Sequence, residues 1–134
     1  MNGYQKYKAQ GIYSMSGAEL LLVLYDEALK RMRMAEHALE DKDYGVFDNC
    51  ITRTVRIVRY LNSILDMEQP ISQEFRTIYE YLFYDLSVIR AGRERRKEDI
   101  GQVIRILSEF RDGFEEAGKK VQEIRTVTSK SVTG

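Results

Sequence analysis

The chain has 134 residues, of which 43% are hydrophobic and 31% are charged, a balance typical of one globular domain and not of a disordered chain. Its 21 basic and 21 acidic residues cancel, so the overall charge gives no support for binding nucleic acid or an anionic membrane. A single proline and the lack of strand-like alternation favour an all-α class.

The first two helices are marked by capping residues and by apolar periodicity. Ser16 and Glu19 form a capping-box pattern that opens a helix over roughly residues 17–40. Asp43 is expected to cap a second helix that ends near Asp66. In both segments the apolar residues recur at spacings of three and four, which predicts one buried stripe on each helix.

Two further helices follow. Pro70 suits the first turn of the third helix, which is expected to end near Gly92, where glycine would adopt the left-handed conformation. The fourth helix is expected to begin at residues 97–99, where acidic side chains complement the helix dipole. Its stripe is expected to contain Ile100, Val103, Leu107, Phe110, Phe114, Ala117, Val121 and Ile124.

The short connections predict how these helices are arranged. Helices joined by so few residues must fold back on one another, which predicts an antiparallel up-down-up-down four-helix bundle over residues 16–125. Residues 1–15 are interpreted as an N-terminal arm, and residues 126–134, small and polar, as a flexible C-terminal tail.

The segment IYEYLFYDLSVI, residues 78–89, is apolar around almost its whole circumference. On a helical wheel Ile78, Tyr79, Leu82, Phe83, Leu86 and Ile89 form a broad core face. Tyr81, Tyr84 and Val88 form a second stripe, which Asp85 is expected to separate from the core on one side.

Leu20 and Leu24 project in a similar way from a second face of the first helix. We interpret Leu20, Leu24, Tyr81, Tyr84 and Val88 as a groove surface that receives an apolar segment of a partner. The alternative is that a wide core absorbs part of this surface and that the tyrosines are simply half-exposed. Two copies of the chain are also expected to be able to pair through such a surface when no partner is present.

The N-terminal arm is a candidate occupant of that surface. It contains Tyr4, Tyr7, Ile12, Tyr13 and Met15 and is more aromatic than an ordinary disordered terminus. The free energy gained by burying the tyrosines is comparable to the cost of ordering the arm. The arm is therefore expected to dock weakly and to be displaceable.

The sequence indicates a cytoplasmic protein. Cys50 is the only cysteine, so no disulfide can form within the chain and a reducing compartment is expected. The N-terminus lacks the apolar region of a secretion signal. The longest apolar run, at residues 20–25, is much shorter than the roughly 18 residues of a membrane span.

Several motifs resemble the bacterial flagellin export chaperone family, FliS. They are YQKY at 4–7, SGAEL at 16–20, LYDEA at 24–28, IVRYLNSILD at 57–66, IYEYL at 78–82 and LSEFRDGF at 107–114. They occur in the family's order over about residues 4–125. The third helix departs from the family pattern at Tyr84–Asp85 and Ile89–Arg90.

The resemblance implies a chaperone of the bacterial cytosol, with no enzymatic activity, cofactor or metal. Its partner would be the disordered C-terminal segment of flagellin, bound in hydrophobic surface grooves. Binding would prevent premature polymerisation and keep flagellin competent for flagellar type III export, with the export gate as a further partner. Tyr4 and Tyr7 would anchor the arm over part of this surface until flagellin displaces it.

Other signals suggest other functions. His37, the only histidine, is expected to face outward, which leaves a helical-bundle adaptor or a histidine phosphotransfer module as the alternative function. The basic stretch at residues 90–97 is interpreted as solvated loop charge, with a weak contact to an acidic partner as the alternative. No spacing typical of a metal site or of a phosphate-binding loop occurs.

Overall fold

The structure is a computed structural model that describes residues 17–133, with the backbone alone at residues 18, 118 and 120–133. Within this range there is no strand, which confirms the all-α class. The elements are α2 (Gly17–Glu40), α3 (Tyr44–Ser63), α4 (Pro70–Gly92), the 3-10 helix η1 (Arg93–Arg96) and α5 (Lys97–Thr133). The expected arm at residues 1–15 and its anchors Tyr4 and Tyr7 lie outside the described residues, as does the expected cap Ser16.

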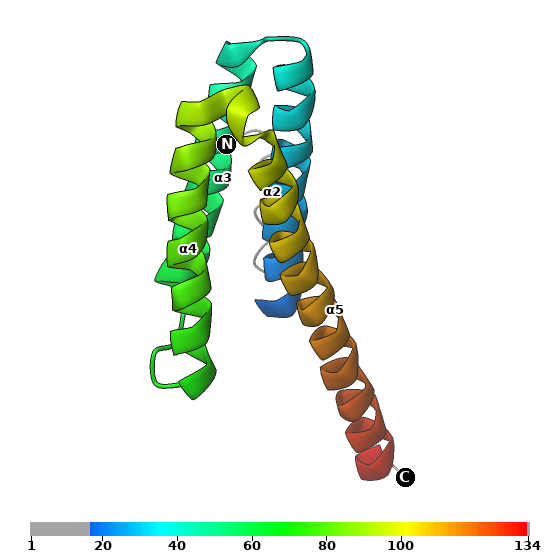
Figure 1. Cartoon of the computed structure of the whole chain (residues 1–134). Helices are drawn as coiled ribbons and strands as arrows, with labels where there is room; N and C mark the ends of the chain where they lie inside the picture. Colours follow the sequence, from blue (N-terminus) through cyan, green and yellow to red (C-terminus); the bar gives the residue numbers. More distant parts are fainter. Residues whose placement is uncertain (1–16, 134) are drawn as a thin grey trace, which may run out of the picture.

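The chain reverses direction at each connection, so that α2 and α4 run opposite to α3 and α5 (Figure 1). The helix α2 packs most extensively against α3 and α5, whereas α3 also packs against α4. The helices α4 and α5 meet near η1 and diverge along the lower half of the molecule in Figure 1.

The core is built from the predicted apolar stripes. Its largest fully buried side chains are Tyr25, Tyr79, Phe47, Met32, Ile51, Leu61, Leu82, Leu86, Ile89, Ile100, Leu107 and Val58. Cys50 is also buried, and burial raises the pKa of its thiol. The stripe predicted for α5 is fully buried up to Leu107. Phe110 and Phe114 are half-buried and still pack against the core, whereas Ala117 is exposed, because α4 diverges from α5 there. The side chains of Val121 and Ile124 lie outside the described ones.

Aromatic side chains fill the region where α4 and α5 diverge. Phe75 of α4 packs edge-on against Phe110 of α5, with ring centroids 5.4 Å apart. Tyr25 of α2 stacks on Phe114 at 5.6 Å and lies 6.1 Å from Phe110. Such contacts add to the stabilisation that comes from burying the rings.

One buried hydrogen bond joins α2 to α4. The hydroxyl oxygens of Tyr25 and Tyr79 lie 2.6 Å apart, and both side chains are buried. A buried hydroxyl without a partner is costly, so each phenol satisfies the other in a place where water is excluded. Burial raises the pKa of both tyrosines, which keeps them neutral.

The turn between α2 and α3 is short and closed by backbone hydrogen bonds. The Asp43 amide donates to the Ala38 carbonyl at 2.8 Å, and the Lys42 amide donates to the Leu39 carbonyl at 3.1 Å. This is a Schellman arrangement, and Lys42, with φ 54°, occupies the left-handed position usually taken by glycine. The Asp43 carboxylate accepts a hydrogen bond from the Val46 amide at 3.2 Å, which confirms the predicted cap.

The corner between α4 and α5 differs from the prediction in one respect. The helix α4 ends at Gly92 as expected, but Gly92 has φ −89°, and the left-handed residue is Arg93, with φ 52°. Glycine is required at position 92 for space, because a Cβ there would collide with the side chain of Arg96 in η1.

Two predicted helix ends are wrong. The helix α3 ends at Ser63 and not near Asp66, whose backbone carbonyl accepts a hydrogen bond from the Ser72 hydroxyl at 2.6 Å in the following turn. The helix α5 continues to Thr133, beyond the expected end near residue 125. The flexibility expected for residues 126–134 stays a prediction.

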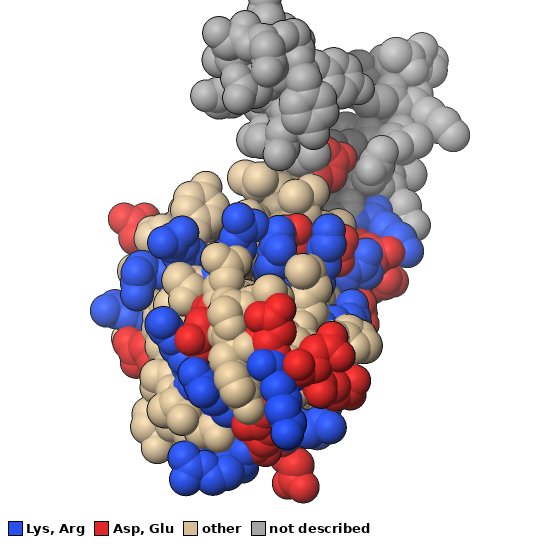
Figure 2. Space-filling view, turned by 90° about the horizontal axis from the view of Figure 1, so that it is seen from above, with Lys and Arg blue, Asp and Glu red and all other residues tan. Residues whose placement is uncertain are grey.

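The surface carries mixed charge. Viewed from above, Lys and Arg side chains alternate with Asp and Glu side chains, separated by uncharged residues (Figure 2). The end of the molecule seen in Figure 2 therefore offers no continuous patch of one sign.

Among the described residues, no helix combines the length and the apolar character that crossing a membrane requires.

The phenol pair leads to a test of core stability. Tyr79→Phe leaves the Tyr25 hydroxyl buried without a partner, so the free energy of unfolding should fall by about 1–3 kcal/mol. The double variant Tyr25→Phe with Tyr79→Phe removes both hydroxyls and should recover most of that loss. Urea denaturation measures the free energy of unfolding of the single and the double variant, with Tyr60→Phe, a substitution at an exposed position, as control. A single variant as stable as the wild type would show that the hydrogen bond is unimportant.

Candidate functional site

The outer face of α4 carries the predicted second stripe. Tyr81 is 44% exposed and Tyr84 68% exposed, although Tyr79 on the same helix is buried. Val88, one turn further along, is half-buried. These residues are spaced by three and four, so they lie on one face of the helix. The core does not absorb the two tyrosines, and α4 presents apolar surface that the described part of the chain leaves uncovered.

The structure does not join the predicted α2 residues to this face. Leu20 and Leu24 are half-buried, and Leu24 packs against the core. The main neighbours of α2 are α3 and α5, which separate it from the outer face of α4. Val23, 48% exposed beside Leu20 and Leu24, is an apolar surface residue that the sequence analysis missed. The five predicted residues therefore occupy two separate surfaces.

Asp85 is not where the helical wheel placed it. It was expected at the polar boundary of the second stripe, but it is only 6% exposed, and its Oδ2 atom has no hydrogen-bond partner. Burial raises the pKa of this carboxyl, and the negative charge of Asp99 raises it further, whereas Arg96 opposes the shift. The expectation is wrong because η1 and the first turn of α5 cover this side of α4.

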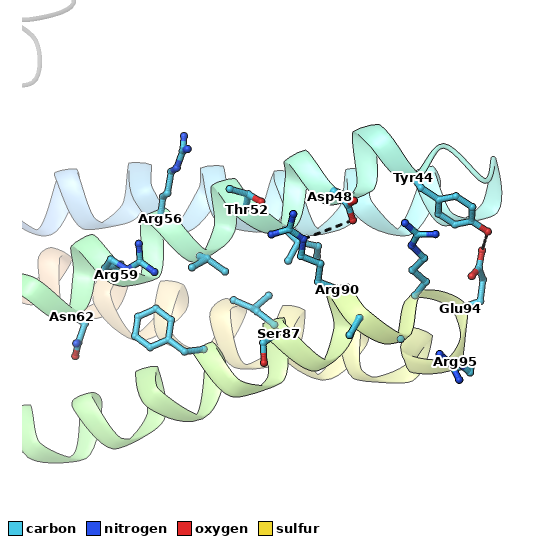
Figure 3. Close-up of a pocket in the computed structure, with 17 residues that line it drawn as sticks. Tyr44, Asp48, Thr52, Arg56, Arg59, Asn62, Ser87, Arg90, Glu94 and Arg95 are labelled. Atoms are coloured by element: carbon cyan, nitrogen blue, oxygen red, sulfur yellow. Dashed lines mark hydrogen bonds and ion pairs between the residues drawn. The ribbon is translucent and has the colours of Figure 1, made fainter.

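A groove with a volume of about 1320 Å³ lies between α3 and α4 (Figure 3). Ile51 and Val55 of α3 and Phe83 and Leu86 of α4 form its apolar floor. Val55 and Phe83 are half-buried and remain accessible from the groove. The sequence analysis missed this site: it predicted that these helices are neighbours, but periodicity does not show which side chains leave a hollow between them.

Polar contacts close one end of this groove. The Tyr44 hydroxyl at the start of α3 donates a hydrogen bond to Glu94 of η1 at 2.6 Å, and this bond lowers the pKa of the Glu94 carboxyl. The Arg93 guanidinium lies 4.1 Å from the centroid of the Tyr44 ring, a cation–π contact. Arg90 points from α4 toward Asp48 of α3, at 3.9 Å (Figure 3).

The structure bears on two other kinds of site, a metal centre and a phosphotransfer histidine. In the part of the chain that the structure describes, no cluster of three or more His, Cys, Asp or Glu side chains is placed to hold a metal ion. His37 is exposed, as predicted, with Nδ1 3.8 Å from the Glu40 carboxylate. A carboxylate at that position would repel an approaching phosphoryl group, so no observation favours phosphotransfer.

The comparisons with known proteins agree with the motifs. The family model described as "Flagellar protein FliS" matches residues 1–121. A protein named "Flagellar secretion chaperone FliS" from Bacillus subtilis (strain 168) is 25% identical over 116 residues, which cover 87% of this chain and 86% of that protein. The matched span contains all the motifs described above.

The buried carboxyl of Asp85 leads to a prediction about how stability depends on pH. Since its folded pKa is raised, the native state holds this proton to higher pH than the unfolded chain does, and stability falls as pH rises through that interval. Asp85→Asn removes this loss, so it should raise the free energy of unfolding at pH 7 by about 1 kcal/mol. Below about pH 4 the gain should vanish.

Urea denaturation at the two pH values measures this gain. Glu74→Gln is the matched control, since it removes a carboxylate from an exposed position on the same helix. An Asp85→Asn variant that is less stable than the wild type at pH 7 would mean that the carboxylate is charged and well solvated.

Proposed function

Because the matched span covers most of the sequence, the chain belongs to the FliS family of flagellar proteins, and from this membership we propose that it is a flagellin-specific export chaperone. It binds the disordered C-terminal segment of flagellin in hydrophobic surface grooves. Binding prevents premature polymerisation and keeps flagellin competent for flagellar type III export. The name of the Bacillus subtilis relative supports a secretion role.

One observation carries the proposal: Tyr81 and Tyr84 stay exposed on a helix whose opposite face is fully packed. Covering a large apolar side chain yields roughly 1.5–3 kcal/mol. Two tyrosines with Val88 therefore supply enough free energy for specific binding after part of it is offset by the ordering of the partner. We assign the flagellin contact to this face, with Leu20 and Leu24 as a second, separate contact.

The scaffold suits a client that wraps around it. We propose that α2 to α5 act as one antiparallel up-down-up-down four-helix bundle, whose rigid core displays apolar strips on different sides. A disordered segment that folds on binding can reach both the α2 and the α4 surfaces, because its chain is long and its backbone adapts. This explains why the predicted contact residues need not form one groove.

The mode of action is binding without catalysis, in the bacterial cytosol. No cofactor or metal takes part. The flagellar export gate is a further partner, to which the chaperone delivers its client. Without a client, two copies pair through the uncovered α4 face, since an exposed apolar strip favours self-association.

The α4 face is tested by substitution. Tyr81→Ala with Tyr84→Ala should weaken binding of the flagellin C-terminal segment at least tenfold in titration calorimetry. The same variant should change the free energy of unfolding by only about 0.5 kcal/mol, because both side chains are outside the core. Tyr60→Ala, 46% exposed on α3, is the matched control and should bind normally. Unchanged affinity in the double variant would refute the assignment of this face.

The arm is tested by deletion. Residues 1–15, with Tyr4 and Tyr7 as anchors, are proposed to cover part of the client surface until flagellin displaces them. Deleting them should leave helical circular dichroism and the melting temperature nearly unchanged and should not weaken flagellin binding. A substantial loss of affinity would instead place the arm within the binding site.

A further inference from the structure

The groove between α3 and α4 has the dimensions of a helix-binding site. Its α3 wall extends from Tyr44, at the closed end, to Asn62, about 27 Å at the rise of an α-helix, and its α4 wall extends from Phe83 to Gly92, about 14 Å. Its volume of about 1320 Å³ exceeds the roughly 300–1,000 Å³ typical of small-molecule pockets. Two parallel walls with an apolar floor between them match the geometry in which an amphipathic helix lays its apolar face into a groove.

The charge on the walls is mainly positive, although the whole chain is neutral. Five arginines and two carboxylates line the groove, so positive charge exceeds negative charge by three. Both carboxylates are occupied, since Asp48 faces Arg90 and Glu94 accepts from Tyr44. Arg56, Arg59 and Arg95 make no ion pair within the described residues.

The free arginines lie along the length of the groove. Arg56 and Arg59 are three residues apart on α3, with Arg56 pointing away from α4 and Arg59 lying closer to the groove, while Arg95 lies at the closed end beside Glu94 (Figure 3). Their guanidinium groups can each receive a carboxylate through two parallel hydrogen bonds. Flanking an apolar floor, they match a helix whose apolar stripe is bordered by Asp and Glu.

We propose that this groove binds an acidic amphipathic helical segment of a protein partner. The site is separate from the α4 face assigned to flagellin, because its α4 wall is formed by Phe83, Leu86 and Arg90, whereas Tyr81 and Tyr84 do not line it. The inference goes beyond the chaperone function and does not depend on it. A partner with this chemistry binds while the tyrosine face stays free for the client.

Charge argues against an occupant from this chain. The arm at residues 1–15 contains Lys6 and Lys8 and no acidic residue, so the arginines would repel it. The last residues, 126–134, contain Lys130 and likewise no acidic residue. An RNA strand is disfavoured because base stacking requires exposed aromatic faces, and Phe83, the one aromatic ring in the floor, is half-buried.

The experiment uses the full chain and two designed helical peptides of about 18 residues, the length of the α3 wall. One peptide carries a leucine stripe flanked by glutamates, and the other carries lysines in place of the glutamates. Fluorescence anisotropy should show binding of the acidic peptide and at least tenfold weaker binding of the basic one. Raising the salt concentration should weaken the acidic complex, because the contacting charges are partly exposed.

Matched variants assign the binding to this groove. Arg56→Glu with Arg59→Glu should reduce affinity for the acidic peptide at least tenfold, and the neutral pair Arg56→Gln with Arg59→Gln should reduce it less. Arg33→Glu with Arg105→Glu makes the same charge change at exposed positions on α2 and α5 and should leave binding intact. Tyr81→Ala with Tyr84→Ala should also leave it intact. Circular dichroism verifies that each variant is folded.

Three outcomes would overturn the proposal. The first is equal affinity for the acidic and the basic peptide, or equal loss in the control arginine pair. The second is preferential binding of a single-stranded RNA oligonucleotide over the acidic peptide, lost in the Arg56→Glu with Arg59→Glu variant. The third is failure of the peptide to bind while sedimentation shows a dimer that the same variant dissociates, which would make a second copy the occupant.

Discussion

The hydrogen bond between Tyr25 and Tyr79 ties the buried face of α4 to α2, and the surfaces of the molecule depend on which side of α4 is buried. Two phenols buried in an apolar core must find each other, since nothing else there accepts or donates a hydrogen bond to them. The bond links helices that do not pack extensively against each other. Together with the burial of Leu82, Leu86 and Ile89, it specifies which side of α4 faces the core. With Tyr79 turned inward, Tyr81 and Tyr84 must face outward.

Once α4 is oriented, each of its sides has a separate use. One side enters the core, and a second forms a wall of the groove with α3. A third, which carries Asp85, is covered by η1 and the start of α5, and a fourth presents tyrosines to the surroundings. This division explains why the helix is apolar over so much of its circumference. An ordinary surface helix needs only one apolar stripe.

Helical periodicity predicted most of the core, because the inward positions of a single helix repeat regardless of its neighbours. It predicted that Tyr81 and Tyr84 lie outside the core for the same reason. The environment of Asp85 was mispredicted, since a helical wheel describes one helix and cannot tell that η1 covers that side.

The groove was missed because it requires side chains from two helices, Val55 and Phe83 among them, whose juxtaposition is a tertiary property. Propensity predicts that the left-handed residue is Gly92, but the backbone places it at Arg93. Glycine at position 92 has another reason, the close approach of the Arg96 side chain, which a single-helix pattern does not show. Motif resemblance identified the family, which periodicity alone does not do.

The tight turn between α2 and α3 has a kinetic consequence. Only Asp41, Lys42 and Asp43 separate these helices, so their contacts form by closing a very short loop. The equally extensive α2–α5 interface must close a loop of more than fifty residues, at an additional entropic cost of roughly 2–3 kcal/mol. The α2–α3 hairpin should therefore assemble first and serve as the template on which α5 condenses. A nascent chain leaving the ribosome would present that hairpin before its last helix had been synthesised.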